Sequence, residues 1–374
     1  MSDGGGPSAH ERVAEGSTKR GRLVAFALPF LLLGLLEGVL RLGGYGYLPA
    51  AGIVIWNAKE DADLLTENAL HRIDPHTLWA PRPGARVPWG ERERVSPQGF
   101  RGADPNPDAR TRVLVLGDSS TFGYGVGFEA TYGAALERGL ADCAPAPIQV
   151  LNGGLIGSTI VQGLERYRLI RSTWRPDVVV LAFGAVNEHW ATSGLDDRAK
   201  LAELAAMRAS GEERRRGFVR WAREELRCVH LAAHLRDLGR GGRVRLLKQQ
   251  ASKSAADAKT GRYLEPGYHR RVTPQVFAEC LEAFLLETSV DGTRLVAVHM
   301  PRPAPTEAER PAVLDYDPRL QAFAQERGVP LAAAHADFRA SGLTDEELFV
   351  DPYHPSELGH ERIAGLLLPL VCPP

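Results

Sequence analysis

From residue 111 to the end of the chain, short apolar segments alternate with longer segments of helical pattern. Alternation of this kind predicts a parallel sheet with helices on both faces, because parallel strands need a crossover connection. With 374 residues, 44% of them apolar, the chain can bury a full core around such a sheet. We expect strands near 112–116, 147–152, 177–183, 294–299 and 329–333, and helices near 129–140, 160–173, 275–288, 317–327 and 358–371.

The first expected strand runs into a polar, glycine-rich turn, RVLVLGDSSTFGYGVG at 112–127. Ligands bind open α/β sheets at this carboxyl end of the strands. The spacing excludes a dinucleotide fingerprint and a P-loop, since five residues separate Gly117 from Gly123 and Tyr124 follows. The G-x-S-x-G elbow is also excluded, because Ser119 is flanked by Asp118 and Ser120 and the second glycine is absent. Two interpretations remain, a helix N-cap and a serine nucleophile at a strand end.

A second polar segment, FVDPYHPSELGHER at 349–362, precedes the last helical pattern. A serine hydroxyl becomes a good nucleophile when an imidazole takes its proton and a carboxylate orients the imidazole. Asp351 and His354 supply these two groups. One alternative is a solvated loop that starts the helix. The other is a metal site of Asp351, His354 and His360, although its spacing matches no recognised metal signature.

Four separated segments carry a further signal, GDSS at 117–120, VLNGGLIGST at 150–159, DVVVLAFGAVNEHW at 177–190 and DPYHPSELGH at 351–360. In this order they resemble the motifs of the SGNH or GDSL-type esterases and acyl-ester hydrolases. The resemblance covers roughly 110–374 and implies a nucleophile at Ser119, a base at His354 and an orienting acid at Asp351. The catalysis that this resemblance implies needs no metal or other cofactor.

The same resemblance implies an oxyanion hole and a strand order. Its donors would be the backbone N–H groups of Ser119 and Gly154 and the side-chain amide of Asn187. The family usually has Gly two residues before this Asn and Asp after it, whereas this chain has Ala185 and Glu188. The implied fold is a three-layer α/β/α, flavodoxin-like parallel sheet of order 2-1-3-4-5.

The N-terminal third predicts a membrane-anchored protein. We expect a disordered cytoplasmic tail at 1–22 and a transmembrane helix at 23–42, whose 20 residues match a bilayer core of about 30 Å. A cleaved signal peptide and a buried helix are the alternatives. Basic residues before the helix place the N-terminus in the cytoplasm and the hydrolase in the periplasm or otherwise outside. Residues 43–110 form a connecting region packed on the hydrolase, and the anchor followed by a GFRG element resembles membrane-anchored bacterial members of the family.

The hydrolase domain, 111–374, contains a helical insertion at 190–272 that is rich in Lys and Arg. The insertion is either a solvated helix pair or a lid over the cleft. Arg270 and Arg271, where the chain re-enters the core fold, are candidate substrate-binding residues. The formal net charge of -1 gives no reason to expect a nucleic-acid partner.

The four cysteines allow three full pairings. In the implied strand order, the helices that end near Cys143 and Cys372 lie side by side on one face, so we predict a disulfide between them. A second bridge, Cys228–Cys280, is the other expectation.

These features together predict a serine esterase that hydrolyses or transfers acyl groups on a cell-envelope glycan or lipid through an acyl-enzyme. A non-catalytic envelope-binding module on the same fold is the alternative.

Overall fold

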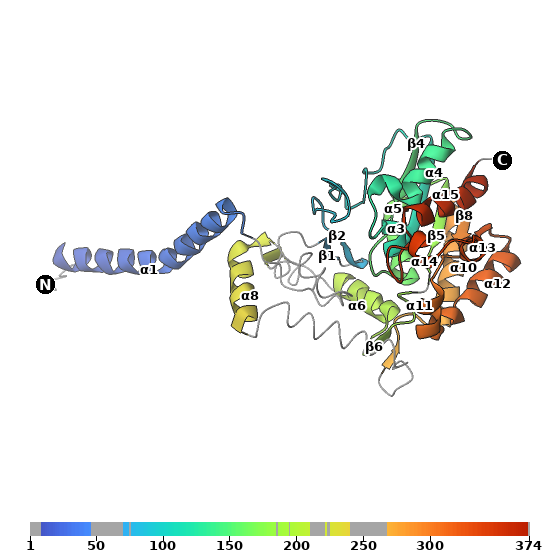
Figure 1. The fold of residues 1–374 in the computed structure, drawn as a ribbon. Helices are drawn as coiled ribbons and strands as arrows, with labels where there is room; N and C mark the ends of the chain where they lie inside the picture. Colours follow the sequence, from blue (N-terminus) through green and yellow to red (C-terminus); the bar gives the residue numbers. More distant parts are fainter. Residues whose placement is uncertain are drawn as a thin grey trace.

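A five-stranded parallel sheet forms the core of the computed structural model, which describes residues 9–45, 70–74, 76–184, 186–193, 195–209, 221–222, 225–239 and 268–372 (Figure 1). The strands lie in the order β4-β3-β5-β8-β9, which is 2-1-3-4-5 when they are numbered along the chain. Their bounds are Thr111–Gly117 for β3, Ile148–Asn152 for β4, Val178–Ala182 for β5, Arg294–Val298 for β8 and Leu331–Ala332 for β9.

Helices cover both faces of the sheet, because each central strand is apolar on both sides. Successive residues of a strand point to opposite faces. Leu114 and Leu116 of β3 pack with one set of helices, and Val113 and Val115 pack with the other. The first set is α5 (Ile160–Arg171), α10 (Pro274–Asp291) and α12 (Asp317–Arg327), and the second is α4 (Tyr132–Leu140), α13 (Ala334–Ala340) and α15 (Glu357–Val371).

The five strands and five long helices lie within a few residues of their expected positions. Shorter helices were not expected from the pattern, since each has too few residues to show a helical period. They are α3 (Ser119–Phe122), α11 (Ala304–Glu309), α13, α14 (Asp345–Leu348) and the 3-10 helices Phe128–Ala130 and Pro311–Asp315.

Part of the connecting region packs against the turn after β3. Its strands β1 (His71–Asp74) and β2 (Leu78–Pro81) form an antiparallel pair. Arg101 is buried, and its guanidinium donates to the carbonyl oxygens of Phe122 at 2.8 Å and Val126 at 2.6 Å. This segment therefore supports the turn that contains Ser119. The rest of the region, 46–69, lies outside the described residues.

The N-terminal helix α1 extends from Ala9 to Leu42. Residues 9–22, which belong to the tail expected to be disordered at 1–22, are helical in the structure, and this segment contains Ala, Glu, Lys and Arg, which favour helix, and no proline. Among the described residues, no helix is both long and apolar enough to cross a membrane, so the expected span at 23–42 is not found. The side chains of 23–25, at its start, are outside the described set.

The described parts of the insertion include two helices and a short antiparallel pair of strands, and the second helix contacts α1. Helices α6 (Asp197–Ala209) and α8 (Arg227–Gly239) lie in the chain between β6 (Ala191–Ser193) and β7 (Tyr268–Arg270), the two strands of that antiparallel pair. At α8, the backbone N–H of Cys228 donates to the Glu37 carboxylate of α1 at 2.9 Å. Residues 210–220 and 240–267 lie outside the described residues, so the lid stays a prediction.

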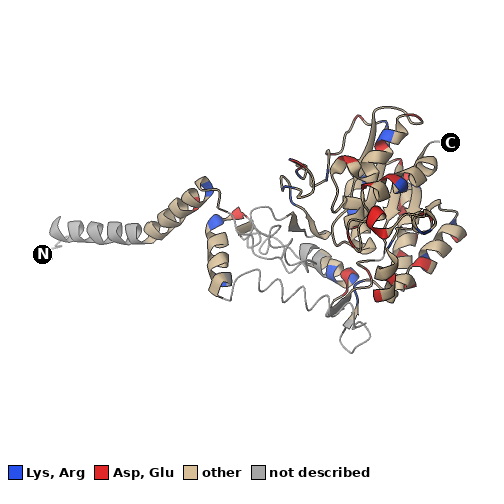
Figure 2. Ribbon diagram, in the orientation of Figure 1, with Lys and Arg blue, Asp and Glu red and all other residues tan. Residues whose placement is uncertain are grey.

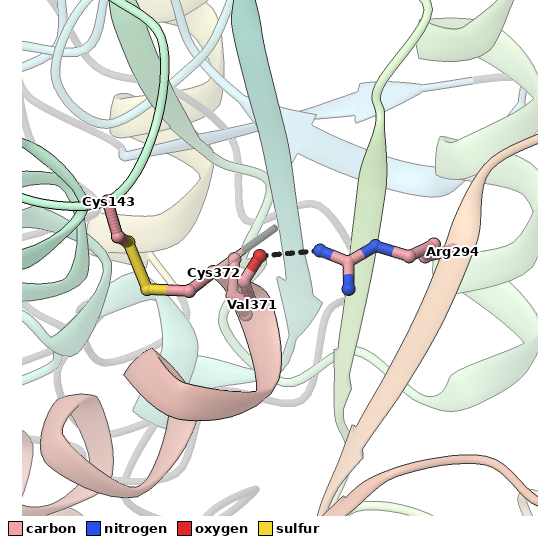
Figure 3. Close-up of a disulfide and its surroundings, with 4 residues drawn as sticks. All are labelled: Cys143, Arg294, Val371 and Cys372. Carbon is pink, nitrogen blue, oxygen red and sulfur yellow. Dashed lines mark hydrogen bonds between the residues drawn. A yellow bond between two sulfur atoms is a disulfide. The ribbon is translucent and has the colours of Figure 1, made fainter. Parts of the chain in front are cut away.

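One of the two expected disulfides is present. Cys143 and Cys372 are bonded, with 5.8 Å between their Cα atoms, which confirms that prediction (Figure 3). Beside the bridge, Arg294 donates to the carbonyl oxygen of Val371 at 2.5 Å. The second pairing is wrong, because Cys280 is buried among the core residues of α10 whereas Cys228 lies on α8 against α1.

Candidate active site

Ser119 is the first residue of α3, directly after β3. The preceding Asp118 is the N-cap, and its carboxylate accepts the backbone N–H of Ser120 at 2.9 Å. The turn therefore fits both interpretations of the sequence, the helix N-cap and the serine at a strand end, since Asp118 caps the helix whose first residue is Ser119. The backbone N–H of Ser119 has no acceptor among the described residues.

Ser119, His354 and Asp351 form one hydrogen-bonded chain. The Oγ of Ser119 lies 2.7 Å from Nε2 of His354. The other ring nitrogen, Nδ1, lies 2.8 Å from both carboxylate oxygens of Asp351. A base bonded to the hydroxyl and oriented by a third group is the arrangement that activates a serine nucleophile.

The Asp351 carboxylate is stabilised as an anion. Burial alone would raise its pKa, but hydrogen bonds from the His354 ring and from the backbone N–H groups of Tyr353 and His354 lower the pKa below its usual value. The carboxylate is thus ionised across the neutral range and holds Nδ1 in its protonated form.

His360 does not join this group. Its ring is buried, Nδ1 accepts the backbone N–H of Tyr132 at 3.2 Å, and burial lowers the pKa of the imidazole to about 3. Within the described part of the chain, no group of His, Cys, Asp and Glu is arranged to hold a metal ion. The metal interpretation of Asp351, His354 and His360 therefore has no support in the geometry.

Gly154 has a different role from the expected one. Its backbone N–H donates to Oδ1 of Asn152 at 3.0 Å, inside the loop that follows β4. A Cβ at this position would lie 2.3 Å from the backbone nitrogen of Phe122. Glycine is needed here because the loop approaches the backbone of α3, not because its N–H faces a substrate.

Gly157, three residues later in the same loop, is the candidate donor in place of Gly154. Its φ of 73° lies in the left-handed region that favours glycine, and its N–H has no acceptor among the described residues. The neighbouring Leu155 N–H and Ser158 hydroxyl both donate to the carbonyl of Gly117, two residues before Ser119. The sequence does mark this glycine, since Gly157 directly precedes Ser158 and Thr159, and Thr159 is the N-cap of α5.

Asn187 lies beside the nucleophile turn, as expected. It is buried, and its side-chain Nδ2 donates to Oδ2 of Asp118 at 3.3 Å. An amide NH₂ has two hydrogens, so one remains for an oxyanion.

Two buried carboxyl groups lie behind this turn. Burial raises the pKa of Asp118, and the hydrogen bond from the Ser120 N–H only partly offsets it. Burial and the negative charge of Asp118 raise the pKa of Glu188 to about 8. Its Oε1 accepts the backbone N–H of Ile160 at 2.8 Å, and Oε2 has no partner in the described structure. Glu188 is therefore largely protonated at neutral pH.

The two candidate substrate-binding arginines are held by protein groups. Arg270 pairs with Asp315 at 2.6 Å and lies over the ring of Tyr316. Arg271 pairs with the buried Asp197 at 2.8 Å and donates to the carbonyl of Gly157 at 2.8 Å. Arg271 thus bonds to protein groups at the site, Asp197 and the Gly157 carbonyl. The predicted contact of Arg270 and Arg271 with substrate finds no support in this geometry.

Comparison with protein families gives a match over residues 115–362 to the GDSL-like lipase/acylhydrolase family. The chain belongs to this family. It is accordingly a hydrolase of ester bonds, as the sequence predicted, and the matched range includes Ser119, Asp351 and His354. No curated protein matches the chain.

Solved structures of the family resemble the chain at low identity. A lipase/acylhydrolase from Enterococcus faecalis is 19% identical, with 70% of this chain and 95% of that one covered and a TM-score of 0.41. An acetylxylan esterase from Geobacillus stearothermophilus is 16% identical, with 70% and 94% covered and a TM-score of 0.41. Neither likeness indicates the substrate of this chain.

Proposed function

We propose that this hydrolase forms an acyl-enzyme on Ser119 and then passes the acyl group to water or to a sugar hydroxyl. The observation that carries the proposal is the hydrogen-bonded chain from Ser119 through His354 to Asp351. A non-catalytic binding module would have no use for a serine, an imidazole and a carboxylate within hydrogen-bond distance of one another.

The reaction follows from these contacts. His354 Nε2 takes the proton of Ser119 as Oγ bonds to the ester carbonyl carbon, and the imidazolium is stabilised by Asp351. The carbonyl oxygen becomes an oxyanion, which the N–H groups of Ser119 and Gly157 and the amide of Asn187 would bind. The bond between the carbonyl carbon and the ester oxygen then breaks as the C=O bond re-forms, and the alcohol leaves with the proton from His354. Water or an acceptor hydroxyl repeats the sequence in reverse.

We propose that the domain acts outside the cytoplasm on acyl groups of a cell-envelope glycan or lipid. The Cys143–Cys372 disulfide supports this location, because structural disulfides persist in oxidising compartments. Hydrolysis and transfer share the acyl-enzyme, so product analysis with and without a glycan acceptor distinguishes them.

The helix α1 supports contact with a lipid surface. Its large apolar side chains are exposed, with Leu31 at 69% and Leu35 at 66%. Among the side chains that the structure describes on this helix, from residue 26 onward, the charged ones, Glu37 and Arg41, lie toward its C-terminal end (Figure 2). Apolar area of this extent gains free energy in a membrane interface. We expect the protein in the membrane fraction after a high-salt wash, and release by salt would contradict the contact.

The test of the proposed chemistry is labelling with a fluorophosphonate, followed by a panel of acyl esters. The wild type should be labelled and Ser119→Ala should not. Ser119→Ala and His354→Ala should each abolish turnover, and the double variant should be hardly slower than either, since the two groups act as a unit. Labelling of Ser119→Ala, or clear additivity, would refute the acyl-enzyme on Ser119.

A further inference from the structure

The peptide unit between Ile156 and Gly157 is held from its carbonyl side. The indole Nε1–H of Trp79, in the connecting region, donates to the carbonyl oxygen of Ile156 at 2.9 Å. In a trans peptide, the C=O and the N–H point in opposite directions. The Gly157 N–H, which belongs to this same unit, therefore points away from Trp79.

The next peptide unit is held as well. The carbonyl of Gly157 accepts Nη1 of Arg271 at 2.8 Å. The guanidinium of Arg271 also lies 5.5 Å from the ring centroid of Trp79, a cation–π contact. Two donors thus hold the carbonyls on either side of Gly157, and rotation of its N–H would break at least one of these bonds.

Arg271 is itself anchored. It pairs with Asp197 at 2.8 Å and donates to Oε1 of Gln162 at 3.1 Å. Asp197 also accepts the Thr159 hydroxyl at 3.0 Å, and its side chain is only 1% exposed. A buried pair with satisfied hydrogen bonds is a rigid support, because separating it would leave an uncompensated charge.

We propose that Trp79 and Arg271 are positioning residues that aim the Gly157 N–H at the oxyanion. The inference rests on the proposed function. It gives the connecting region and the end of the insertion a part in catalysis through the position of a donor rather than through contact with the substrate.

The first test is Trp79→Phe, which keeps an aromatic ring and removes the indole N–H. We expect kcat for p-nitrophenyl acetate to fall by about tenfold with KM within about twofold, because a misdirected donor loses part of the 10²–10³-fold effect of a complete oxyanion donor. Phenylboronic acid forms a tetrahedral adduct with a serine, and its Ki should rise by a similar factor.

The matched control is Trp174→Phe. The Trp174 Nε1–H also donates to a loop carbonyl, that of Asn106, at 3.1 Å. Trp174 follows α5 and lies at the opposite end of the sheet from Ser119, before β5 begins. This variant should lose comparable thermal stability and keep its kcat.

The second test is Arg271→Lys, with Arg112→Lys as its control. A lysine keeps the charge near Asp197 but has no planar fork to bond Asp197 and the Gly157 carbonyl together. Arg112 likewise donates to loop carbonyls, those of Pro107 and Ala109, at the amino end of β3, the end opposite Ser119. We expect a several-fold lower kcat only in Arg271→Lys.

An unchanged kcat and boronate Ki in folded Trp79→Phe and Arg271→Lys would overturn the inference, as would equal losses in the controls. If the wild type neither turns over esters nor reacts with fluorophosphonate at Ser119, the proposed function has failed instead. The two failures are therefore distinguishable.

Discussion

The ring of Tyr124 stacks on the imidazole of His354, with 4.3 Å between ring centroids and 24° between ring planes. Tyr124 is fixed to the nucleophile turn, because its backbone N–H donates to the carbonyl of Ser119 at 2.9 Å. Trp89 packs against the Tyr124 ring, 4.2 Å between centroids. The imidazole is thus held in its plane by hydrogen bonds and across its plane by an aromatic ring.

Replacing Tyr124 should therefore impair the base. We expect Tyr124→Leu to lower kcat by about tenfold, since an aromatic pair contributes about 0.5–1.5 kcal/mol beyond its area and the ring also limits imidazole rotation. Tyr124→Phe keeps the stack and should retain most of the activity. Steady-state kinetics on one acyl ester compares the two, and equal loss in Phe and Leu would show that the hydroxyl matters rather than the stack.

Asp351→Asn should lower kcat by about 10³–10⁴-fold, because the amide favours the wrong imidazole tautomer. The pKa of Asp351 is lowered in the fold, so the stability it contributes is present above its unfolded value of 3.8 and is lost as pH falls through the lower folded value. Thermal melts from pH 2 to 7 should show the difference between the wild type and Asp351→Asn shrinking below about pH 4. A constant difference would contradict the ionised carboxylate.

Glu188→Gln should change stability at neutral and alkaline pH rather than at acid pH. Because the pKa of Glu188 is raised to about 8, its contribution to stability is complete below about pH 4.5 and is lost as pH rises through 8. The glutamine stays neutral and keeps an oxygen for the Ile160 N–H. The melting temperature of the variant relative to the wild type should rise by at least about 3 °C between pH 5 and 9.

The control for this change is Glu129→Gln, since the Glu129 side chain is 85% exposed. It should show no such trend. A Glu188→Gln difference that does not vary with pH would mean that the buried carboxyl keeps an ordinary pKa.

Loss of the Cys143–Cys372 bridge should cost stability and spare catalysis. The bridge closes a loop with a sequence separation of 229, and removing such a link typically costs about 2–5 kcal/mol. We expect Cys143→Ser to melt roughly 4–15 °C below the wild type with kcat nearly unchanged. Reductant should lower the wild-type melting temperature toward that of the variant, and no response to reductant would show that the bridge does not form.

The sheet, its long helices and the chain Ser119–His354–Asp351 could be predicted from the sequence. Strands such as Val178–Ala182 are apolar on both faces, and the serine and histidine motifs are short and local. The Cys143–Cys372 pair followed once the strand order placed two helices side by side.

The backbone of the oxyanion loop could not be predicted in the same way. Gly154 and Gly157 stand three residues apart in one loop. Their roles differ because the Gly154 N–H has an acceptor, Asn152, whereas the Gly157 N–H has none among the described residues. Arg271 looked like a substrate-binding residue because its partner, Asp197, is 74 positions earlier in the chain. Pairings of this kind depend on the tertiary fold rather than on local pattern.

Ser119 and His354 are hydrogen-bonded across 235 positions of the chain. Because synthesis reaches the nucleophile long before the base, a nascent chain that ends between these two positions has the serine but lacks the imidazole that would take its proton. Esterolytic activity thus begins only once synthesis has reached the last helix and the sheet has closed. Incomplete chains of this hydrolase are therefore inactive on the esters of the cell that makes them.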